Sequence, residues 1–232
     1  ALLDSVAPAF AELRELVLEQ QAVATTDDGA WKHPDGDAYY RLRLRNLTTT
    51  DLTATEIHDL GLSEVARIHD EMRGIMAQVG FEGDLQAFFA FMREDPQFYY
   101  PNTDEGRDAY LQNSNELIAD MKPRLGDTFA TLPKAELDVK RVEPFRERSA
   151  GKAFYYAPAP DGSRPGTYYV NLYDMADMAV YELDALAYHE AVPGHHMQIA
   201  IAQELDGLPK LRRLDGNYTA YIEGWGLYSE YL

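Results

Sequence analysis

The chain has 232 residues, which is enough for one ordinary domain or two small ones. Apolar residues make up 46% and charged residues 26%, fractions typical of a folded globular protein and not of a disordered one. Lys and Arg total 21 against 39 Asp and Glu, so the formal net charge of −18 opposes nucleic-acid binding. The absence of Cys excludes disulfides, thiolate metal sites and Cys nucleophiles.

The two ends of the sequence indicate a piece of a longer protein. The chain begins without Met and without a recognisable signal peptide, and it stops at Glu230-Tyr231-Leu232 inside a predicted helix. We therefore expect further residues on both sides, which can include a targeting signal. No run approaches the ~18 apolar residues of a membrane span, so we expect none in this chain.

Three segments make up most of the first 50 residues. From Leu3 to about Val23, apolar residues recur at helical spacing, which predicts a helix with one buried face formed by Val6, Phe10, Leu13, Leu16 and Val17. Residues 27–37 are polar and contain Gly and Pro, which indicates a loop. Residues 39–47 fit a helix or a strand equally well.

Three further helices are predicted before residue 122. The longest spans residues 53–79, where Thr53 and Glu56 form a capping box and Gly61 is a possible break. Asp84 can cap a short aromatic helix that must end before Pro96, because proline has no backbone N–H to donate. Thr103 or Asp104 can cap a third helix that runs to about Met121.

The pattern changes near residue 132. Residues 136–142, 153–157 and 167–173 are predicted strands, and helices return at about 178–206 and 217–232. The expected fold is therefore mainly α with a small antiparallel β element, of the α+β class. We divide the chain into a helical region, 1–132, and a core region, 133–232, that is incomplete at its C-terminal end.

Three of the six His residues fall within eight residues, in His189-Glu190-Ala191-Val192-Pro193-Gly194-His195-His196. Apolar helical segments flank this stretch on both sides. Burying several imidazoles and a carboxylate costs free energy unless they are paired or bind a metal. The cluster therefore predicts a metal site.

The spacing of the cluster departs from the usual zinc-peptidase pattern, in which two His one helical turn apart bind zinc. The position four residues after His189 is Pro193, whose missing N–H would have bonded the carbonyl of His189. If two residues loop out there, His195 arrives where the second His would be. We favour His195 as the second ligand, with His196 as an alternative ligand or as a donor to substrate.

A third ligand is available in the last predicted helix. Glu223 lies among aromatic and apolar residues that indicate a largely buried helix, and a buried carboxylate there would need a partner such as a dication. Gly224 and Gly226 allow another helix to approach closely. The set His189, His195 and Glu223 matches the thermolysin-type arrangement for Zn²⁺.

Glu190 follows a proposed ligand directly and is the candidate general base on the attacking water. The structural alternative is a hydrogen-bonded pair of core histidines, with Glu223 paired to Arg212 or Arg213. No other cofactor is suggested by the sequence.

The sequence HEAVPGHHMQIA, followed by YIEGWGLYSEYL, resembles a bacterial family of uncharacterised proteins, many of them described as lipoproteins or secreted proteins, that is grouped with the gluzincin metallopeptidases. DGSRPGTYYVNLYD and EIHDLGLSEVARIHDEM at 56–72 extend the resemblance from about residue 50 to the end of the chain. It implies a mostly helical zincin-like fold, peptide hydrolysis and a periplasmic, lipoprotein or secreted location. It also implies a strand that holds extended substrate, for which we choose residues 167–173.

The expected function is that of a zinc-dependent peptidase or amide hydrolase, in which a metal-activated water attacks a peptide bond with Glu190 as general base. The substrate would be a peptide or a small amide. Two alternatives stay open: a metal-dependent hydrolase of non-peptide substrates, and a non-catalytic peptide-binding protein on a peptidase fold. The sequence does not determine the oligomeric state.

Overall fold

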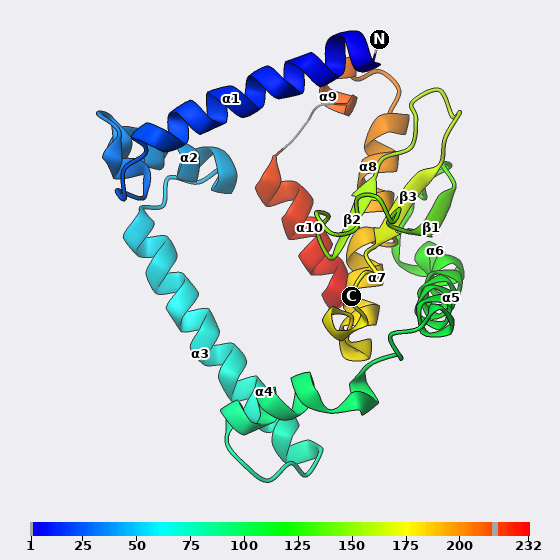
Figure 1. Ribbon diagram of the computed structural model, residues 1–232. Helices are drawn as coiled ribbons and strands as arrows, with labels where there is room; N and C mark the ends of the chain where they lie inside the picture. The colour runs from blue at the N-terminus through cyan, green and yellow to red at the C-terminus, as the bar shows by residue number, and fades with distance from the viewer. Residues whose placement is uncertain (1, 215–217) are drawn as a thin grey trace.

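A computed structural model describes residues 2–214 and 218–232. Most of these residues are helical, and one three-stranded sheet lies beside the C-terminal helices (Figure 1). The expectation of a mainly α chain with a small β element is therefore confirmed.

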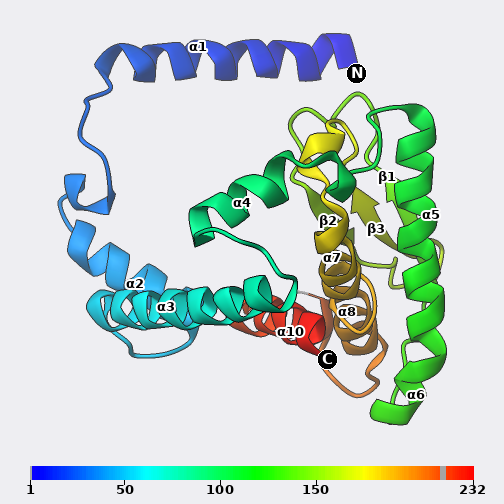
Figure 2. The same ribbon diagram turned by 90° about the horizontal axis from the view of Figure 1, so that it is seen from below.

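The first helix is present, but its apolar face is not buried. A π-helical turn, Leu2–Val6, continues into α1 (Ala7–Val23), and no described residue of α1 is buried. Phe10 is 68% exposed and Leu13 is 53% exposed. Figures 1 and 2 show α1 lying apart from the sheet, so the predicted burial of this face is wrong for the described chain.

The next two helices follow a short 3-10 turn, Ala30–Lys32. Residues 39–47 form part of a helix, α2 (Gly36–Thr48), and not a strand. In α3 (Ala54–Gln78) the predicted capping box is confirmed, since Thr53 and Glu56 exchange both bonds. Gly61 does not break α3, because one glycine costs a helix only about 1 kcal/mol.

Helix α4 (Leu85–Glu94) begins where the sequence predicts. The carboxylate of Asp84 accepts a bond from the N–H of Ala87, and α4 ends before Pro96, which opens a 3-10 turn, Pro96–Phe98. The start of α4 packs on the end of α3 in a small apolar core formed by Met76, Leu85 and Phe88.

Helix α5 (Asp104–Met121) is capped by Thr103, whose hydroxyl accepts a bond from the N–H of Gly106. A 3-10 turn, Lys122–Arg124, and the short α6 (Leu125–Thr128) follow it. Figure 2 shows α5 running along the sheet.

The sheet has the strand order β1-β3-β2, from β1 (Leu137–Arg141), β2 (Ala153–Tyr156) and β3 (Gly166–Val170). β3 pairs antiparallel with β2 but parallel with β1, so the sheet is mixed and not antiparallel throughout. The choice of residues 167–173 as a strand that accepts substrate is wrong. β3 is the central strand, and its backbone groups already pair on both sides.

The two faces of the sheet have different partners. Tyr155 and Tyr168, which lie opposite each other in the β2–β3 register, turn toward the helices. On the other face, Arg146 lies over the rings of Phe154 and Tyr169, with its guanidinium 4.8 Å from the centre of the Tyr169 ring. The helix-facing side therefore contributes to the main core.

The main core joins α5, β3 and α7 (Leu183–Glu190) through fully buried side chains that include Tyr110, Tyr168, Val170, Leu183 and Ala187. It takes residues from both sides of position 132. The division of the chain at that position into two regions stays a prediction.

The predicted helix at 178–206 is divided into several pieces. Two 3-10 turns, Met175–Asp177 and Val180–Glu182, precede α7, and a break at 191–194 separates it from α8 (His195–Glu204). The chain continues through α9 (Lys210–Leu214), which we did not predict, to α10 (Thr219–Tyr231). The predicted start of the last helix, residue 217, lies outside the described residues. None of the described helices is long and apolar enough to span a bilayer.

Candidate metal centre

The site forms where the helix opens between α7 and α8. α7 ends at Glu190, and Pro193 lacks the N–H that would continue it. A Cβ on Gly194 would overlap the carbonyl oxygens of Tyr188 and His189, so only glycine fits this close approach. The N–H of His196 donates to the carbonyl of Ala191 at 3.1 Å, five residues back, where an α-helix would use the fourth.

This break brings the imidazole rings of His189 and His195 into contact, at an interplanar angle of 83°. Their Nε2 atoms lie 3.1 Å apart, and the ring centres are 4.5 Å apart. Burial lowers the pKa of His195, and the neighbouring His189 lowers it further. His195 is therefore kept in the neutral form that binds metals.

Helix α10 is held against the break by two hydrogen bonds. Trp225 donates from Nε1 to the carbonyl of Pro193 at 2.8 Å, and Gln198 donates from Nε2 to the carbonyl of Tyr221 at 3.1 Å. Gly226 lies directly against the His189 ring, since a Cβ there would come within 2.6 Å of Nε2. The predicted close approach is confirmed at Gly226 but not at Gly224, where a Cβ would meet nothing within 4 Å.

Glu223 reaches the two histidines from α10. Its Oε2 lies 3.4 Å from Nε2 of His189 and 3.7 Å from Nε2 of His195. The three side chains thus point ligand atoms toward one another. The structural alternative paired Glu223 with an arginine, but Arg213 donates to the carbonyl of Gln203 instead.

The prediction that α10 is largely buried is wrong. Only Gly226 and Ser229 are buried in it, and the side chain of Glu223 is 59% exposed. Aromatic residues at Tyr221 and Tyr228 suggested burial, but both lie on the exposed side of the helix. As a consequence, the centre is open on the side of Glu223.

The spacing of the three ligand atoms fits a tetrahedral zinc ion. Ligand atoms at zinc bond lengths of ~2.0–2.2 Å and tetrahedral angles stand about 3.3 Å apart. The separations of 3.1, 3.4 and 3.7 Å lie close to this value. Two imidazoles and one carboxylate also form a donor set that zinc accepts.

Glu190, the predicted general base, follows His189 at the end of α7 and is 7% exposed. Burial raises the pKa of its carboxyl to about 7; Glu223 raises it as well, and His189 opposes the rise. A carboxyl group with a pKa near neutrality can both take up and release a proton at physiological pH.

Glu230 is a member of the site that the sequence analysis missed. Its Oε1 lies 2.7 Å from Nδ1 of His189, on the ring nitrogen opposite the one that faces Glu223. A proton on Nδ1 leaves the lone pair of Nε2 free, as a metal ligand requires. The signal was its position two helical turns after Glu223, on the same face of α10.

Glu230→Gln is expected to weaken zinc binding by about 10- to 100-fold, because an amide holds the His189 ring less firmly than a carboxylate. Competition with a chromophoric chelator would measure the affinity. Glu204→Gln is a matched control, since Glu204 lies on α8 and bonds backbone N–H groups elsewhere. Equal zinc affinities in the wild type and Glu230→Gln would contradict a supporting role for this carboxylate.

His196 is not brought together with the other two histidines of the cluster. Its Nδ1 lies 2.9 Å from the Tyr155 hydroxyl, and its Nε2 lies 3.1 Å from the carbonyl oxygen of Ala135. Both ring nitrogens of His196 therefore contact residues on the side of α8 that faces the sheet. A Cβ on Gly166 would lie 2.6 Å from Nδ1 of His196, which explains a glycine at the start of β3.

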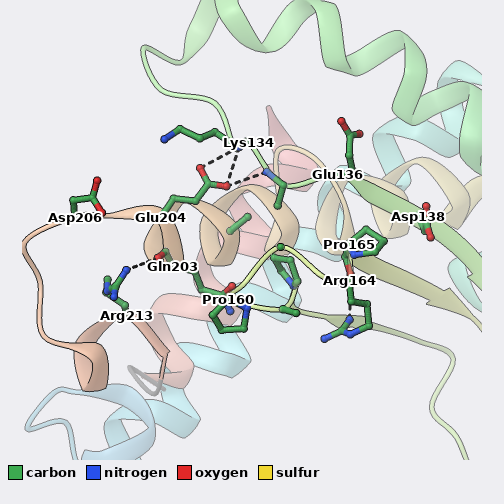
Figure 3. A pocket seen from close by; sticks show the side chains of 15 residues that line it. Lys134, Glu136, Asp138, Pro160, Arg164, Pro165, Gln203, Glu204, Asp206 and Arg213 are labelled. Atoms are coloured by element: carbon green, nitrogen blue, oxygen red, sulfur yellow. Dashed lines mark hydrogen bonds between the residues drawn. The ribbon is translucent and has the colours of Figure 1, made fainter.

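A hollow of about 630 Å³ lies on the His196 side of α8, and Figure 3 shows its lining. Glu204 accepts bonds from the backbone N–H groups of Lys134 and Ala135. These bonds and the contact of His196 with Ala135 hold the segment before β1 against α8. Charged groups that line this hollow bond to the protein itself, as Glu204 does to backbone N–H groups and Arg213 does to the carbonyl of Gln203.

His196 should make the stability of the protein depend on pH. Burial lowers its pKa to about 4, against ~6.5 for an unfolded His. As the pH drops, the unfolded state therefore takes up the proton before the folded state does. The contribution of His196 to the free energy of unfolding is complete above pH 6.5 and falls by about 3 kcal/mol as the pH drops toward 4. Urea unfolding of the wild type and His196→Gln between pH 7.5 and 4.5 should show a shallower dependence in the variant. Equal slopes would contradict this role.

The family assignment comes from a match over the whole chain. The model of a bacterial protein of unknown function (DUF885) matches residues 1–232. The chain belongs to this family. No curated protein matches it.

A solved structure, "The crystal structure of the putative lipoprotein from Colwellia psychrerythraea", is similar to the chain with 35% sequence identity and a TM-score of 0.93. The similar region covers 99% of this chain and 39% of that one, so the chain spans about two fifths of its neighbour's length. The likeness supports the arrangement of helices and sheet described above.

Proposed function

We propose that this DUF885 chain carries the metal centre of a zinc-dependent peptidase or amide hydrolase of the gluzincin type. The observation that carries the proposal is the convergence of His189, His195 and Glu223 at separations of 3.1–3.7 Å, beside the buried carboxyl of Glu190. A purely structural histidine pair would not need Glu223 at the same point, nor a separate carboxylate on Nδ1 of His189.

The two imidazoles and Glu223 would hold the ion, and the exposed side of Glu223 leaves room for water and substrate. When bound, zinc supplies a Lewis acid and makes an attacking water acidic near neutral pH. Glu190 takes the proton from that water and later gives it to the leaving amine. Its raised pKa suits both steps, because the same carboxyl must accept and release a proton.

An extended peptide needs a free strand edge if it is to bind by β-augmentation. β3 is paired on both sides, but β2 pairs only with β3 within the described chain and packs against α7 (Figure 1). The outer edge of β2 is therefore the proposed position for substrate backbone, in place of the central strand.

We further propose a periplasmic, lipoprotein or secreted location. The similar structure is described as a lipoprotein. This agrees with the location that the sequence resemblance implies.

The proposal is tested with a peptide library and the zinc-loaded protein, with Glu223→Ala, which lacks one proposed zinc ligand, kept in the same zinc solution as a blank. Cleavage should appear, disappear after chelation and return with added zinc. Cleavage of ester or small-amide substrates alone would assign a non-peptide hydrolase instead. Binding of peptides without turnover by a zinc-loaded protein would contradict catalysis.

A further inference from the structure

Several buried polar atoms in and around the candidate centre have no hydrogen-bond partner among the described residues, including Nδ1 of His195 and Oε1 of Gln198. Three others are the hydroxyls of Tyr110 and Tyr168 and Oε2 of Glu190. Both tyrosines are 0% exposed, and Glu190 is 7% exposed. Burying a hydroxyl or carboxyl oxygen without a partner costs free energy, so native proteins rarely leave such atoms unpaired.

The three groups belong to one region of the core. Tyr110 comes from α5 and Tyr168 from β3, and both belong to the same cluster as Ala187 of α7 and Ala191, which follows directly after Glu190 at the end of α7. Burial raises the pKa of Tyr168, and the charges of Tyr110 and Glu190 raise it further. Tyr110 and Glu190 are therefore the two ionisable groups that act on the Tyr168 hydroxyl.

Packing alone does not explain the two hydroxyls. Phenylalanine would fill nearly the same volume at positions 110 and 168 without burying an oxygen. Tyr155, on the same face of the sheet, shows the usual solution, because its hydroxyl lies 2.9 Å from a ring nitrogen of His196. The hydroxyls of Tyr110 and Tyr168 therefore need a partner of their own.

We propose that a buried water joins the hydroxyl of Tyr168 to Oε2 of Glu190, with the hydroxyl of Tyr110 as its third partner. Buried waters commonly make about three hydrogen bonds to polar groups that are otherwise unpaired. Tyr168 is then a positioning residue: it fixes the rotation of the Glu190 carboxyl from behind and leaves the other oxygen to act in the cleft. This last role rests on the proposed function, whereas the water site does not.

Infrared spectroscopy of the zinc-free protein tests the water site directly. Wild type and Glu190→Gln are both labelled with ¹³C-glutamate, and the carboxyl bands of Glu190 are isolated by subtracting the spectrum of the variant from that of the wild type. Tyr168→Phe should shift these bands, and Tyr169→Phe should not, because Tyr169 lies on the opposite face of the sheet. Unshifted bands in a folded Tyr168→Phe would overturn the proposal.

A measurement without variants covers the case in which Tyr168→Phe fails to fold. A crystal structure of the wild type that resolves buried waters must show one within hydrogen-bond distance of both Tyr168 and Glu190. Its absence would overturn the proposal.

Activity gives a separate readout for the positioning role. In a chain that hydrolyses peptides, Tyr168→Phe should lower kcat about 10- to 100-fold with KM and zinc content unchanged. A zinc-loaded wild type that hydrolyses nothing would refute the proposed function and leave the water site to the spectra. An unchanged kcat in a variant with shifted bands would overturn the positioning role alone.

Discussion

Replacing His195 with alanine is expected to abolish stoichiometric zinc binding. The wild type should hold about one zinc per chain after dialysis, whereas His195→Ala should lose more than about 100-fold in affinity. Removal of a first ligand must cost more than loss of a supporting carboxylate, which costs about 10- to 100-fold. Elemental analysis of protein purified without a polyhistidine tag measures this directly.

His196→Gln is the matched control, since it changes the adjacent histidine. The amide can still donate to the carbonyl of Ala135, and His196 points away from the centre toward Tyr155. It should keep its zinc. Zinc lost from His196→Gln and retained by His195→Ala would reverse the assignment of the second ligand, and zinc retained by both would remove His195 from the site.

The capping signals of the sequence predict the starts of α3, α4 and α5 correctly. Thr53 with Glu56, Asp84 and Thr103 each satisfy backbone N–H groups at a helix start, so the signal and the structure it predicts lie within three residues. The break at Pro193 is equally local, because a missing N–H and a glycine act within one turn.

Burial was predicted less well because it depends on what packs against a helix. α1 has the apolar spacing of a buried helix, yet none of its described residues is buried. α10 carries many aromatic residues, but Tyr221 and Tyr228 lie on its outer side while Gly226 faces His189. The periodicity of a sequence shows which side of a helix is apolar, but it does not show whether another element packs against that side.

The order of the strands and the role of Glu230 could not be predicted from the sequence alone. Strand order is a long-range property, and β3, which overlaps the predicted strand at 167–173, is central because it is rich in residues that suit burial on both faces. Glu230 was missed because its position on the same face of α10 as Glu223 becomes a signal only once that face is known to contact His189, which is 41 residues away from Glu230.

Replacing Glu190 with glutamine is expected to remove hydrolysis while zinc stays bound. The amide has nearly the same shape as the carboxyl but cannot accept the proton of the attacking water, so kcat should fall by about 100- to 10,000-fold with KM nearly unchanged. Zinc content should equal that of the wild type, because Glu190 is not one of the three converging ligands.

Stability supplies the control for this variant. Burial raises the pKa of Glu190 to about 7, so in the zinc-free protein its stabilising contribution, complete below the unfolded pKa of ~4.3, is lost as the pH rises through 7. A neutral glutamine avoids this loss, and zinc-free Glu190→Gln should be at least as stable as the wild type at pH 8 in urea unfolding. Hydrolysis at the wild-type rate by a zinc-loaded, folded Glu190→Gln would exclude Glu190 as the general base for the attacking water.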